Sequence, residues 1–237
     1  MKLILPLFLA SLLCASIAMA SPLTGTFQMN GVVTATSTAF TWTGVNGTTP
    51  NMFTLSLGTG TFAGEDGQNN IQDLNSTTEP VGTTFPPQDF IDFSVTPGLP
   101  SLWIDFIPMG NGGAAGCSQP ATGTVPPQTC TPPIPGGSPI TFQNNNENGT
   151  VTGSSATWTS SGVTSDGSSH WTGIFTSQFV GQSYQDVLHT FATTGSVTAA
   201  YSANVAVGPN VPEPATVLTG GLGALFVILV RRRRRQV

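Results

Sequence analysis

The sequence predicts an all-β protein, a sandwich or a jelly roll with one short helix. Three observations support this fold class. From residue 22 to about residue 207, apolar and polar residues alternate, Thr, Val, Phe and Trp are frequent, and Gly, Asn and Pro interrupt the pattern. Such features are typical of short strands joined by turns. Both ends differ in composition, so we expect one folded domain over residues 21–208, a length of roughly 190 residues that suits a single β domain.

The alternation is clearest in the middle of the chain. Ile91, Phe93 and Val95 would share one face of a strand, because successive side chains point to opposite faces. The same pattern predicts strands over residues 24–29, 32–36, 39–43, 52–57, 59–63, 90–95, 102–107, 140–143, 150–159, 170–177 and 196–207.

One helix is predicted over residues 184–193. Ser183 and Asp186 have the spacing of a capping box, and Gly195 suits the C-terminal cap. One face of this helix would carry Val187, Leu188, Phe191 and Ala192. We expect the helix to cover one end of the sheet.

A different composition marks residues 108–139, which are rich in Pro and Gly and lack apolar periodicity. This predicts a long surface loop, since strand patterns resume on both sides. Cys117 and Cys130 lie within it, and an even number of cysteines in an exported chain favours a disulfide. Closing a loop of this length contributes about 3 kcal/mol of stability.

The charged residues are separated along the chain. The six basic residues are Lys2 and the arginines at 231–235, whereas all eleven acidic residues lie between residues 21 and 230. A surface without cations cannot neutralise phosphates, so we expect no nucleic-acid partner.

The N-terminus has the parts of a secretory signal peptide. Lys2 precedes a short apolar run, and an A-x-A sequence ends at Ala20. The pattern predicts a signal peptide over residues 1–20, with cleavage between Ala20 and Ser21. A lipoprotein anchor on Cys14 is a weaker alternative, because the residue before it is not small.

The C-terminal segment, residues 209–237, combines three parts in order: a short Pro-containing motif, an uncharged and mostly apolar run at 215–230, and an arginine cluster. At 1.5 Å per residue the run reaches about 24 Å as a helix, and it could cross a bilayer core of about 30 Å by local thinning. The arginines would stay in the cytoplasm and leave the main domain outside. The motif is Val211, Pro212, Glu213 and Pro214, and the predicted cytoplasmic anchor is Arg231, Arg232, Arg233, Arg234 and Arg235.

Together these three parts resemble the PEP-CTERM sorting tail. The resemblance covers only this C-terminal segment. It implies that an exosortase recognises the tail, cleaves near the Pro-Glu-Pro sequence and passes the protein to the cell surface. The protein would be exported, held at the inner membrane by its C-terminal transmembrane helix, and then placed on the cell surface or in the extracellular matrix. An ordinary tail-anchored span is the alternative.

Catalytic patterns are weak. A triad could be assembled from Ser168, His170 and Asp166, but the G-x-S-x-G elbow is absent. Paired carboxylates could cleave glycosides, although solvated charges on strand faces are the simpler interpretation. The candidates for such a pair are Asp89, Asp92 and Asp105. We therefore predict that the protein is not an enzyme.

Binding patterns are weak as well. The densest group of oxygen ligands lies at 65–73, where Glu65, Asp66 and Asp73 are weak candidates for calcium ligands, but the spacing does not match an EF-hand. An ordinary polar turn is the simpler interpretation, so we predict no metal or cofactor, with calcium as the alternative. The tryptophans would form a sugar-binding platform if exposed, and core if they lie on strands. They are Trp42, Trp103, Trp158 and Trp171.

The sequence therefore predicts a non-enzymatic exported protein of the cell surface or extracellular matrix, with an exosortase as its processing partner. Two alternatives remain open: a polysaccharide-binding surface module, with or without calcium, and a carboxylate-based glycoside hydrolase.

Overall fold

The computed structural model describes residues 21–93, 98–124 and 126–210. The predicted signal peptide, with Ala20, and the sorting motif, the apolar run and the arginine cluster of the tail lie outside these residues. The strands are β1 (Gly25–Thr36), β2 (Ala39–Thr43), β3 (Met52–Ser56), β4 (Gly67–Ile71), β5 (Leu74–Asn75), β6 (Thr84–Asp92), β7 (Leu102–Phe106), β8 (Thr129–Cys130), β9 (Thr141–Glu147), β10 (Thr150–Thr164), β11 (Ser169–Val180) and β12 (Ser196–Pro209). The helical elements are η1 (Gly60–Phe62), η2 (Ala115–Ser118) and α2 (Tyr184–Thr194).

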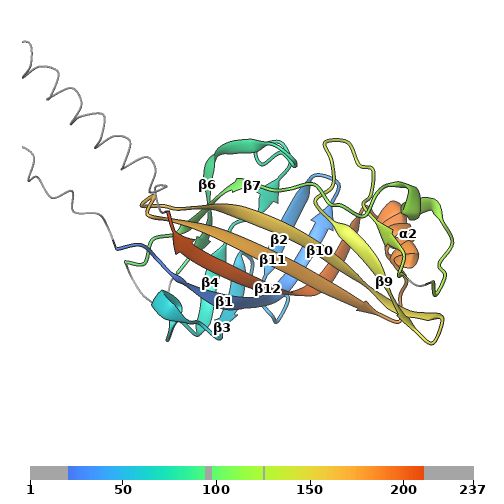
Figure 1. Ribbon diagram of the computed structural model, residues 1–237, viewed down its shortest axis with the longest axis horizontal. Helices are drawn as coiled ribbons and strands as arrows, with labels where there is room; N and C mark the ends of the chain where they lie inside the picture. The colour runs from blue at the N-terminus through green and yellow to red at the C-terminus, as the bar shows by residue number, and fades with distance from the viewer. Residues whose placement is uncertain (1–20, 94–97, 125, 211–237) are drawn as a thin grey trace, which may run out of the picture.

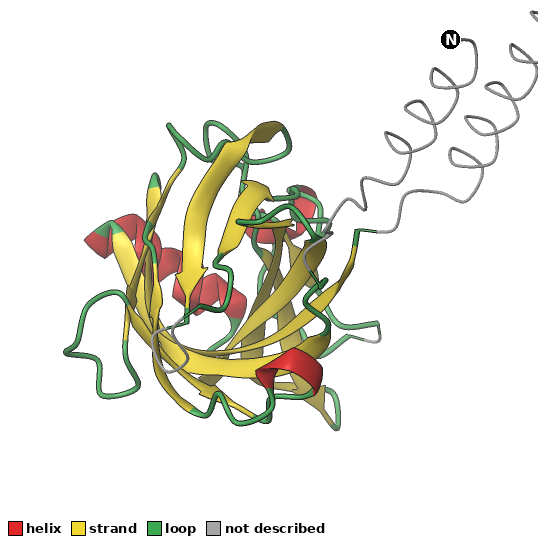
Figure 2. Ribbon diagram, turned by 90° about the vertical axis from the view of Figure 1, so that its left-hand side faces the viewer, coloured by secondary structure: helices red, strands yellow, loops and turns green. Residues whose placement is uncertain are grey.

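All twelve strands belong to one sheet, and this sheet closes on itself at one end of the molecule. Strands β10, β11, β12, β1, β3, β4, β6 and β7 are each paired with the next, and β7 returns to β10. Figure 2, seen along the long axis, shows the strands arranged around the core. The all-β class is confirmed, but the sequence predicted a sandwich or jelly roll, whereas the structure has a single curled sheet. The difference arises because β7 and β10 pair directly and join what would otherwise be two sheet edges.

Two of the long strands change partner along their length. Residues 28–30 of β1 pair with β3, whereas residues 32–35 pair with β2. Likewise, β10 pairs with β7 near its C-terminal end and with β9 near its N-terminal end. The sheet is therefore closed at one end and open at the other. Helix α2 lies at the open end (Figure 1).

Both ends of the described chain leave from the closed end. Strands β1 and β12 are antiparallel along their whole length, with Gly25 opposite Val207. The segments before β1 and after β12 therefore begin next to each other, and α2 lies at the opposite end of the molecule (Figure 1).

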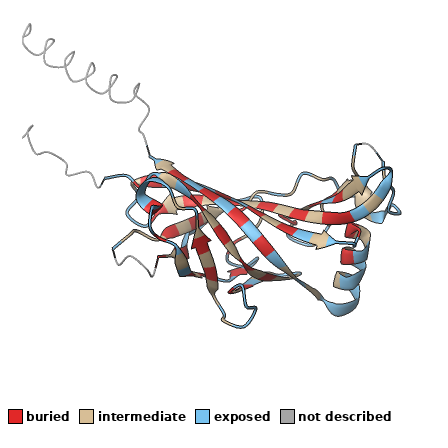
Figure 3. Ribbon diagram, turned by 90° about the horizontal axis from the view of Figure 1, so that it is seen from below, coloured by how far each residue is buried: buried red, intermediate tan, exposed pale blue. Residues whose placement is uncertain are grey.

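Side chains on the inner face of the sheet form the core. Buried and exposed residues alternate along the long strands (Figure 3). The larger hydrophobic cluster fills the closed end and contains, among others, Phe27, Phe53, Phe90 and Trp171. A smaller cluster under α2 contains Cys130, Phe142, Ala156, Tyr184 and Val187. The described residues thus form two hydrophobic clusters inside one sheet.

Helix α2 agrees with the prediction. The Ser183 hydroxyl accepts a hydrogen bond from the backbone N–H of Asp186, and the Asp186 carboxylate accepts one from the Ser183 N–H, which completes the capping box. Gly195 caps the C-terminus with a left-handed backbone. On the predicted apolar face Val187 is buried, whereas Ala192 is exposed.

Several predicted strands have different boundaries or do not form. In place of the strand predicted at 59–63, residues 60–62 form the 3-10 helix η1, and Gly60 has a φ of +59° that strand residues avoid. Residues 67–71, which looked like a ligand-rich turn, are strand β4. The region 108–139 is not a plain loop, because it contains η2 and the short strand β8.

Candidate functional site: an apolar cleft at the open end

An apolar cleft lies between the two hydrophobic clusters of the described structure. It has a volume of about 130 Å³ and is open to the surface on one side. Residues from β1, β2, β10, β11, β12 and α2 line it, together with the segment 132–140. The cleft exists because the sheet is not closed at this end, so the inner faces of the long strands extend beyond the aromatic core.

An aromatic layer forms the floor of the cleft. The ring of Trp158, which lines the cleft, stacks on Phe175 with 5.3 Å between centroids and 11° between planes. Behind it, Trp42 meets Tyr201 edge-on at 5.0 Å. Offset and edge-to-face contacts of this kind stabilise aromatic clusters, so the floor is a rigid surface.

Four polar atoms in and behind this floor have no hydrogen-bond partner: Trp42 Nε1, Trp158 Nε1, Ser177 Oγ and Tyr201 Oη. Trp158 and Ser177 line the cleft and are 4% and 2% exposed. Burial raises the pKa of Tyr201, so its hydroxyl stays protonated. Buried polar groups are nearly always paired, so this concentration marks the floor as unusual.

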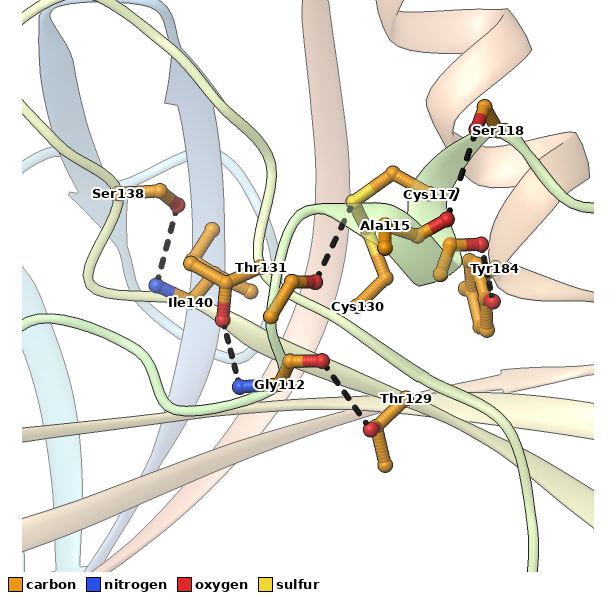
Figure 4. Close-up of a disulfide and its surroundings, with 12 residues drawn as sticks. Gly112, Ala115, Cys117, Ser118, Thr129, Cys130, Thr131, Ser138, Ile140 and Tyr184 are labelled. Atoms are coloured by element: carbon orange, nitrogen blue, oxygen red, sulfur yellow. Dashed lines mark hydrogen bonds between the residues drawn. A yellow bond between two sulfur atoms is a disulfide. The ribbon is translucent and has the colours of Figure 1, made fainter.

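A disulfide holds the segments under α2 together (Figure 4). Cys117 in η2 and Cys130 in β8 are joined, with their Cα atoms 5.0 Å apart, as the sequence predicted. The Tyr184 hydroxyl donates a hydrogen bond of 2.8 Å to the Gly116 carbonyl. Helix α2, which forms one wall of the cleft, is therefore attached to the disulfide-bonded segment.

A buried asparagine makes a second attachment. Asn144 in β9 is fully buried, and its Oδ1 accepts a hydrogen bond of 2.9 Å from the Tyr184 N–H. Its amide group donates to the side chains of Gln128 and Gln185, each at 3.1 Å. This network joins β9, the β8 segment and the first turn of α2.

One carboxylate lies among the lining residues. Glu79 is 8% exposed, and its Oε2 accepts a hydrogen bond of 2.7 Å from the backbone N–H of Asn75. From residue 21 to residue 230 the sequence contains no Lys or Arg. Among the described residues, the cleft therefore has one carboxyl group beside an apolar lining and no Lys or Arg near it.

The residues proposed for a catalytic triad do not form one. The Ser168 hydroxyl donates to Asp166 at 2.9 Å in the turn between β10 and β11, and His170 is exposed on β11. Partial burial acts to raise the pKa of Asp166, but hydrogen bonds from Thr164 and Ser168 outweigh it and hold that pKa below its ordinary value. The Asp166 carboxylate thus stabilises a turn.

The three carboxylates considered for glycoside cleavage lie on neighbouring strands. Partial burial and the nearby carboxylate of Asp92 raise the pKa of Asp89. Burial also raises the pKa of Asp105, and the charge of His170 opposes that rise. Asp92 accepts a hydrogen bond from the Ser101 hydroxyl. None of these carboxylates lines the apolar cleft.

The candidate calcium ligands are placed on either side of β4. Glu65 is buried before the strand, Asp66 is exposed, and Asp73 follows the strand. The Asp73 Oδ1 accepts a hydrogen bond of 2.9 Å from the Trp42 N–H. Across residues 21–93, 98–124 and 126–210, no three His, Cys, Asp or Glu side chains come together as metal ligands.

Three of the four tryptophans are core residues. Trp42, Trp158 and Trp171 are buried on strands, and Trp103 is half-buried. They therefore do not form the exposed sugar-binding platform that was considered from the sequence. The Trp171 Nε1–H donates to the Trp103 carbonyl at 2.8 Å, which ties β11 to β7 inside the sheet.

Sequence reasoning missed the cleft. Its lining residues are spread from Val33 to Ala199 and come together only through long-range strand pairing. One signal was available. The apolar face of the helix continues to Phe191, beyond the part that is fully buried, and Phe191 lines the cleft.

Comparison with known proteins identifies the C-terminal segment. Residues 210–235, directly after β12, match a family model of a protein-sorting signal, so the chain is a protein with a C-terminal sorting tail. The family is the PEP-CTERM protein-sorting motif, which confirms the resemblance noted in the sequence. The motif implies exosortase-dependent sorting of an exported protein. No curated protein and no solved structure matches the chain.

The predicted membrane helix at 215–230 lies outside the described residues. Within the described ranges, no helix has the length and apolarity needed to cross a bilayer.

Proposed function

We propose that this protein is a non-enzymatic body displayed on the cell surface or in the extracellular matrix after an exosortase has processed its tail. The PEP-CTERM motif at residues 210–235 carries this proposal. The motif follows a strand of the sheet, so processing there would leave the folded body intact.

The arrangement of the chain ends supports display by a single tether. The folded body begins just after the predicted cleavage before Ser21 and ends just before Val211. Both of these points lie at the closed end of the sheet (Figure 1). Strand β12 has 14 residues, which at about 3.3 Å each gives about 45 Å between the tether and the α2 end. The open end and its cleft would therefore point away from the tether.

Mass spectrometry of the protein recovered from the surface fraction tests the proposal. We expect an N-terminus at Ser21 and the loss of the arginines at 231–235. A variant with Pro212→Ala, Glu213→Ala and Pro214→Ala should keep its tail and stay in the membrane fraction. A matched variant with Thr216→Ala, outside the motif, should be processed normally. Recovery of the intact arginine cluster at the surface would contradict the proposal.

The alternatives have less support. A polysaccharide-binding surface would need exposed aromatic side chains, and three of the four tryptophans are core residues. A hydrolase would need two carboxylates facing one cleft, and Glu79 is the one carboxylate among the residues that line the apolar cleft. Titration with polysaccharides, with and without a calcium chelator, tests the first alternative, and release of reducing sugar tests the second.

A further inference from the structure

We propose that Asn148, at the tip of the β9–β10 hairpin, is a site of spontaneous deamidation, in which the protein's own backbone and water replace the side-chain amide by a carboxylate. The proposal goes beyond the display function and does not depend on how the tail is processed. It rests on a comparison of the Asn-Gly sequences of the chain, whose reacting groups the structure holds in different ways. They are Asn30-Gly31, Asn46-Gly47, Asn111-Gly112 and Asn148-Gly149.

The reaction needs only the two residues and water. The backbone nitrogen of Gly149 attacks the side-chain carbon Cγ of Asn148, the Cγ–Nδ2 bond breaks, and the amide nitrogen leaves as ammonia with the proton of the attacking nitrogen. Water then opens the resulting cyclic imide at either of its carbonyl carbons, which gives aspartate or isoaspartate. No oxidant, reductant or cofactor takes part. Attack within one chain is fast when the two reacting atoms are free to meet, so the structure around each Asn-Gly sequence sets its rate.

Both reacting groups of Asn148-Gly149 are free. The two residues form the turn between β9 and β10, and their φ values are +50° and +79°, the left-handed backbone that a two-residue hairpin turn requires. Both are exposed. Within the part of the chain that the structure describes, no group accepts a hydrogen bond from the Gly149 N–H, and none bonds to the Asn148 amide.

The turn must open before the backbone nitrogen can reach the side-chain carbon, and little holds it closed. Glu147 and Thr150 form the last pair of the β9–β10 ladder, and the register of the ladder shifts soon after it. One residue further down, the Asn146 side chain donates a hydrogen bond of 2.7 Å to the Thr124 carbonyl. Opening can therefore stay confined to the last pair, and such frayed turns open at the lowest cost in a folded protein.

At Asn46 the same groups are occupied. Its Oδ1 accepts a hydrogen bond of 3.1 Å from the Thr48 N–H, and the Gly47 N–H donates to the Gly44 carbonyl at 2.7 Å. Both bonds must break before the nitrogen can attack. Each bond should slow the reaction about fivefold, so the two together should slow it about 25-fold.

The other two sequences are held as firmly or more so. The Asn111 Oδ1 accepts from the Thr141 hydroxyl at 3.0 Å, and the Gly112 N–H donates to the Thr131 hydroxyl oxygen at 2.8 Å. Asn30 lies inside β1, where it pairs with both β12 and β3. Attack at Asn30 therefore requires that a central strand of the sheet opens.

Deamidation of Asn148 would change both the charge and the backbone of the hairpin. The new carboxylate would stand next to Glu147, and no Lys or Arg occurs between residues 21 and 230 to balance it. Isoaspartate also adds a carbon atom to the backbone, which the two-residue turn does not accommodate. The turn lies at the open end, far from both ends of the described chain (Figure 1). Because ammonia is lost, the change would accumulate there as the protein ages.

Peptide mass spectrometry of the aged protein tests the proposal. The full chain in lipid nanodiscs is incubated at neutral and at mildly alkaline pH and then digested with pepsin, because acid stops the reaction and residues 21–230 offer trypsin no Lys or Arg. We expect Asn148 to lose its amide about 25-fold faster than Asn46 and Asn111. Asn30 should stay unmodified. The rate at Asn148 should rise with pH, since the attacking nitrogen must lose its proton.

Unfolding and two variants separate the effect of the structure from that of the sequence. In urea the Asn-Gly sequences should react at similar rates, because the bonds that protect three of them are gone. Thr131→Val removes the acceptor of the Gly112 N–H, so it should speed the reaction at Asn111 about fivefold and leave Asn148 unchanged. Asn148→Gln lengthens the side chain and should stop the reaction at this position only.

Two results would overturn the proposal. One is that Asn148 in the folded chain keeps its amide as long as Asn46 and Asn111 keep theirs. The other is that the preference for Asn148 is as large in urea as in the folded chain, which would mean that the neighbouring residues and not the free turn set the rate.

Discussion

At the scale of single residues, closure of the sheet depends on Gly162. A Cβ atom at this position would lie 1.8 Å from the Trp103 carbonyl oxygen, where no side chain fits. Gly162 stands at the register shift between β10 and β7, the pairing that closes the ring. The same carbonyl accepts the hydrogen bond from Trp171, so it is not free to move aside.

We predict that Gly162→Ala lowers the free energy of unfolding by about 3 kcal/mol, because overpacking forces the backbone of β7 away from β10. Urea unfolding followed by tryptophan fluorescence measures this. The control is Gly208→Ala on β12, where no atom lies within 4 Å of an added Cβ, and we expect a change of no more than about 0.5 kcal/mol. Equal effects of the two substitutions would contradict this account of the closure.

The contributions of Asp89 and Asp166 to the stability of the fold should change with pH in opposite directions. The pKa of Asp89 is raised above its ordinary value of 3.8, so the folded state favours the protonated carboxyl group over the charged one. The protein is therefore less stable at neutral pH than in acid as far as Asp89 is concerned, because stability falls as pH rises from 3.8 through the raised pKa. Asp89→Asn should therefore stabilise the protein at pH 7 and have no effect near pH 3. Solvent screening limits the gain to about 0.5 kcal/mol.

Asp166 is the matched comparison, because its pKa is lowered. Its charged form is favoured in the folded state, so its contribution is present above pH 3.8 and is lost as pH falls. Asp166→Asn should destabilise the protein at neutral pH, and the difference should shrink in acid. Melting temperatures of both variants from pH 3 to pH 7 measure the two trends, and parallel curves would refute the assignment.

At the scale of elements, the capping box satisfies backbone donors at the first turn of α2 from within the helix itself, beside the bonds to Asn144. Ser183→Ala removes the acceptor for the Asp186 N–H and should lower the free energy of unfolding by about 1 kcal/mol. Ser183→Thr keeps a hydroxyl that accepts from the Asp186 N–H and donates to the Asp186 carboxylate, so it should recover most of the loss. Thermal unfolding of the two variants tests this, and a Ser183→Thr protein as unstable as Ser183→Ala would argue against the cap.

Helix α2 could be predicted from the sequence, whereas the curled sheet and the cleft could not. The helix follows from local signals, since Ser183, Asp186 and Gly195 act within a few residues of each other. The curled sheet does not, because β7 and β10 are far apart in sequence and their pairing depends on Gly162 meeting Trp103. Strand β6 begins earlier than predicted because its prolines fall in an irregular stretch of the β6–β7 pairing. The cleft could not be predicted for the same reason as the sheet, because Trp158 and Val187 meet only after long-range pairing.

At the scale of the whole molecule, the two hydrophobic clusters divide the protein into a closed end and an open end. The closed end is held by strands paired on both sides and by a large aromatic core. The open end is held by a small cluster, the Asn144 network and the disulfide. Regions with fewer buried apolar contacts open more readily, so the open end should be the less stable part.

Removing the disulfide should therefore affect one end only. In the Cys117→Ser/Cys130→Ser variant, loss of a cross-link over about 13 residues should cost about 3 kcal/mol at the open end. Hydrogen exchange should become faster in β8, in β9 and in α2, whose Tyr184 hydroxyl bonds to the cross-linked segment. Amides in β3, β4 and β6 lie at the closed end and should keep their protection, which makes them the internal control. A uniform loss of protection in all strands would mean that the two clusters unfold as one unit and that the cleft is no boundary between them.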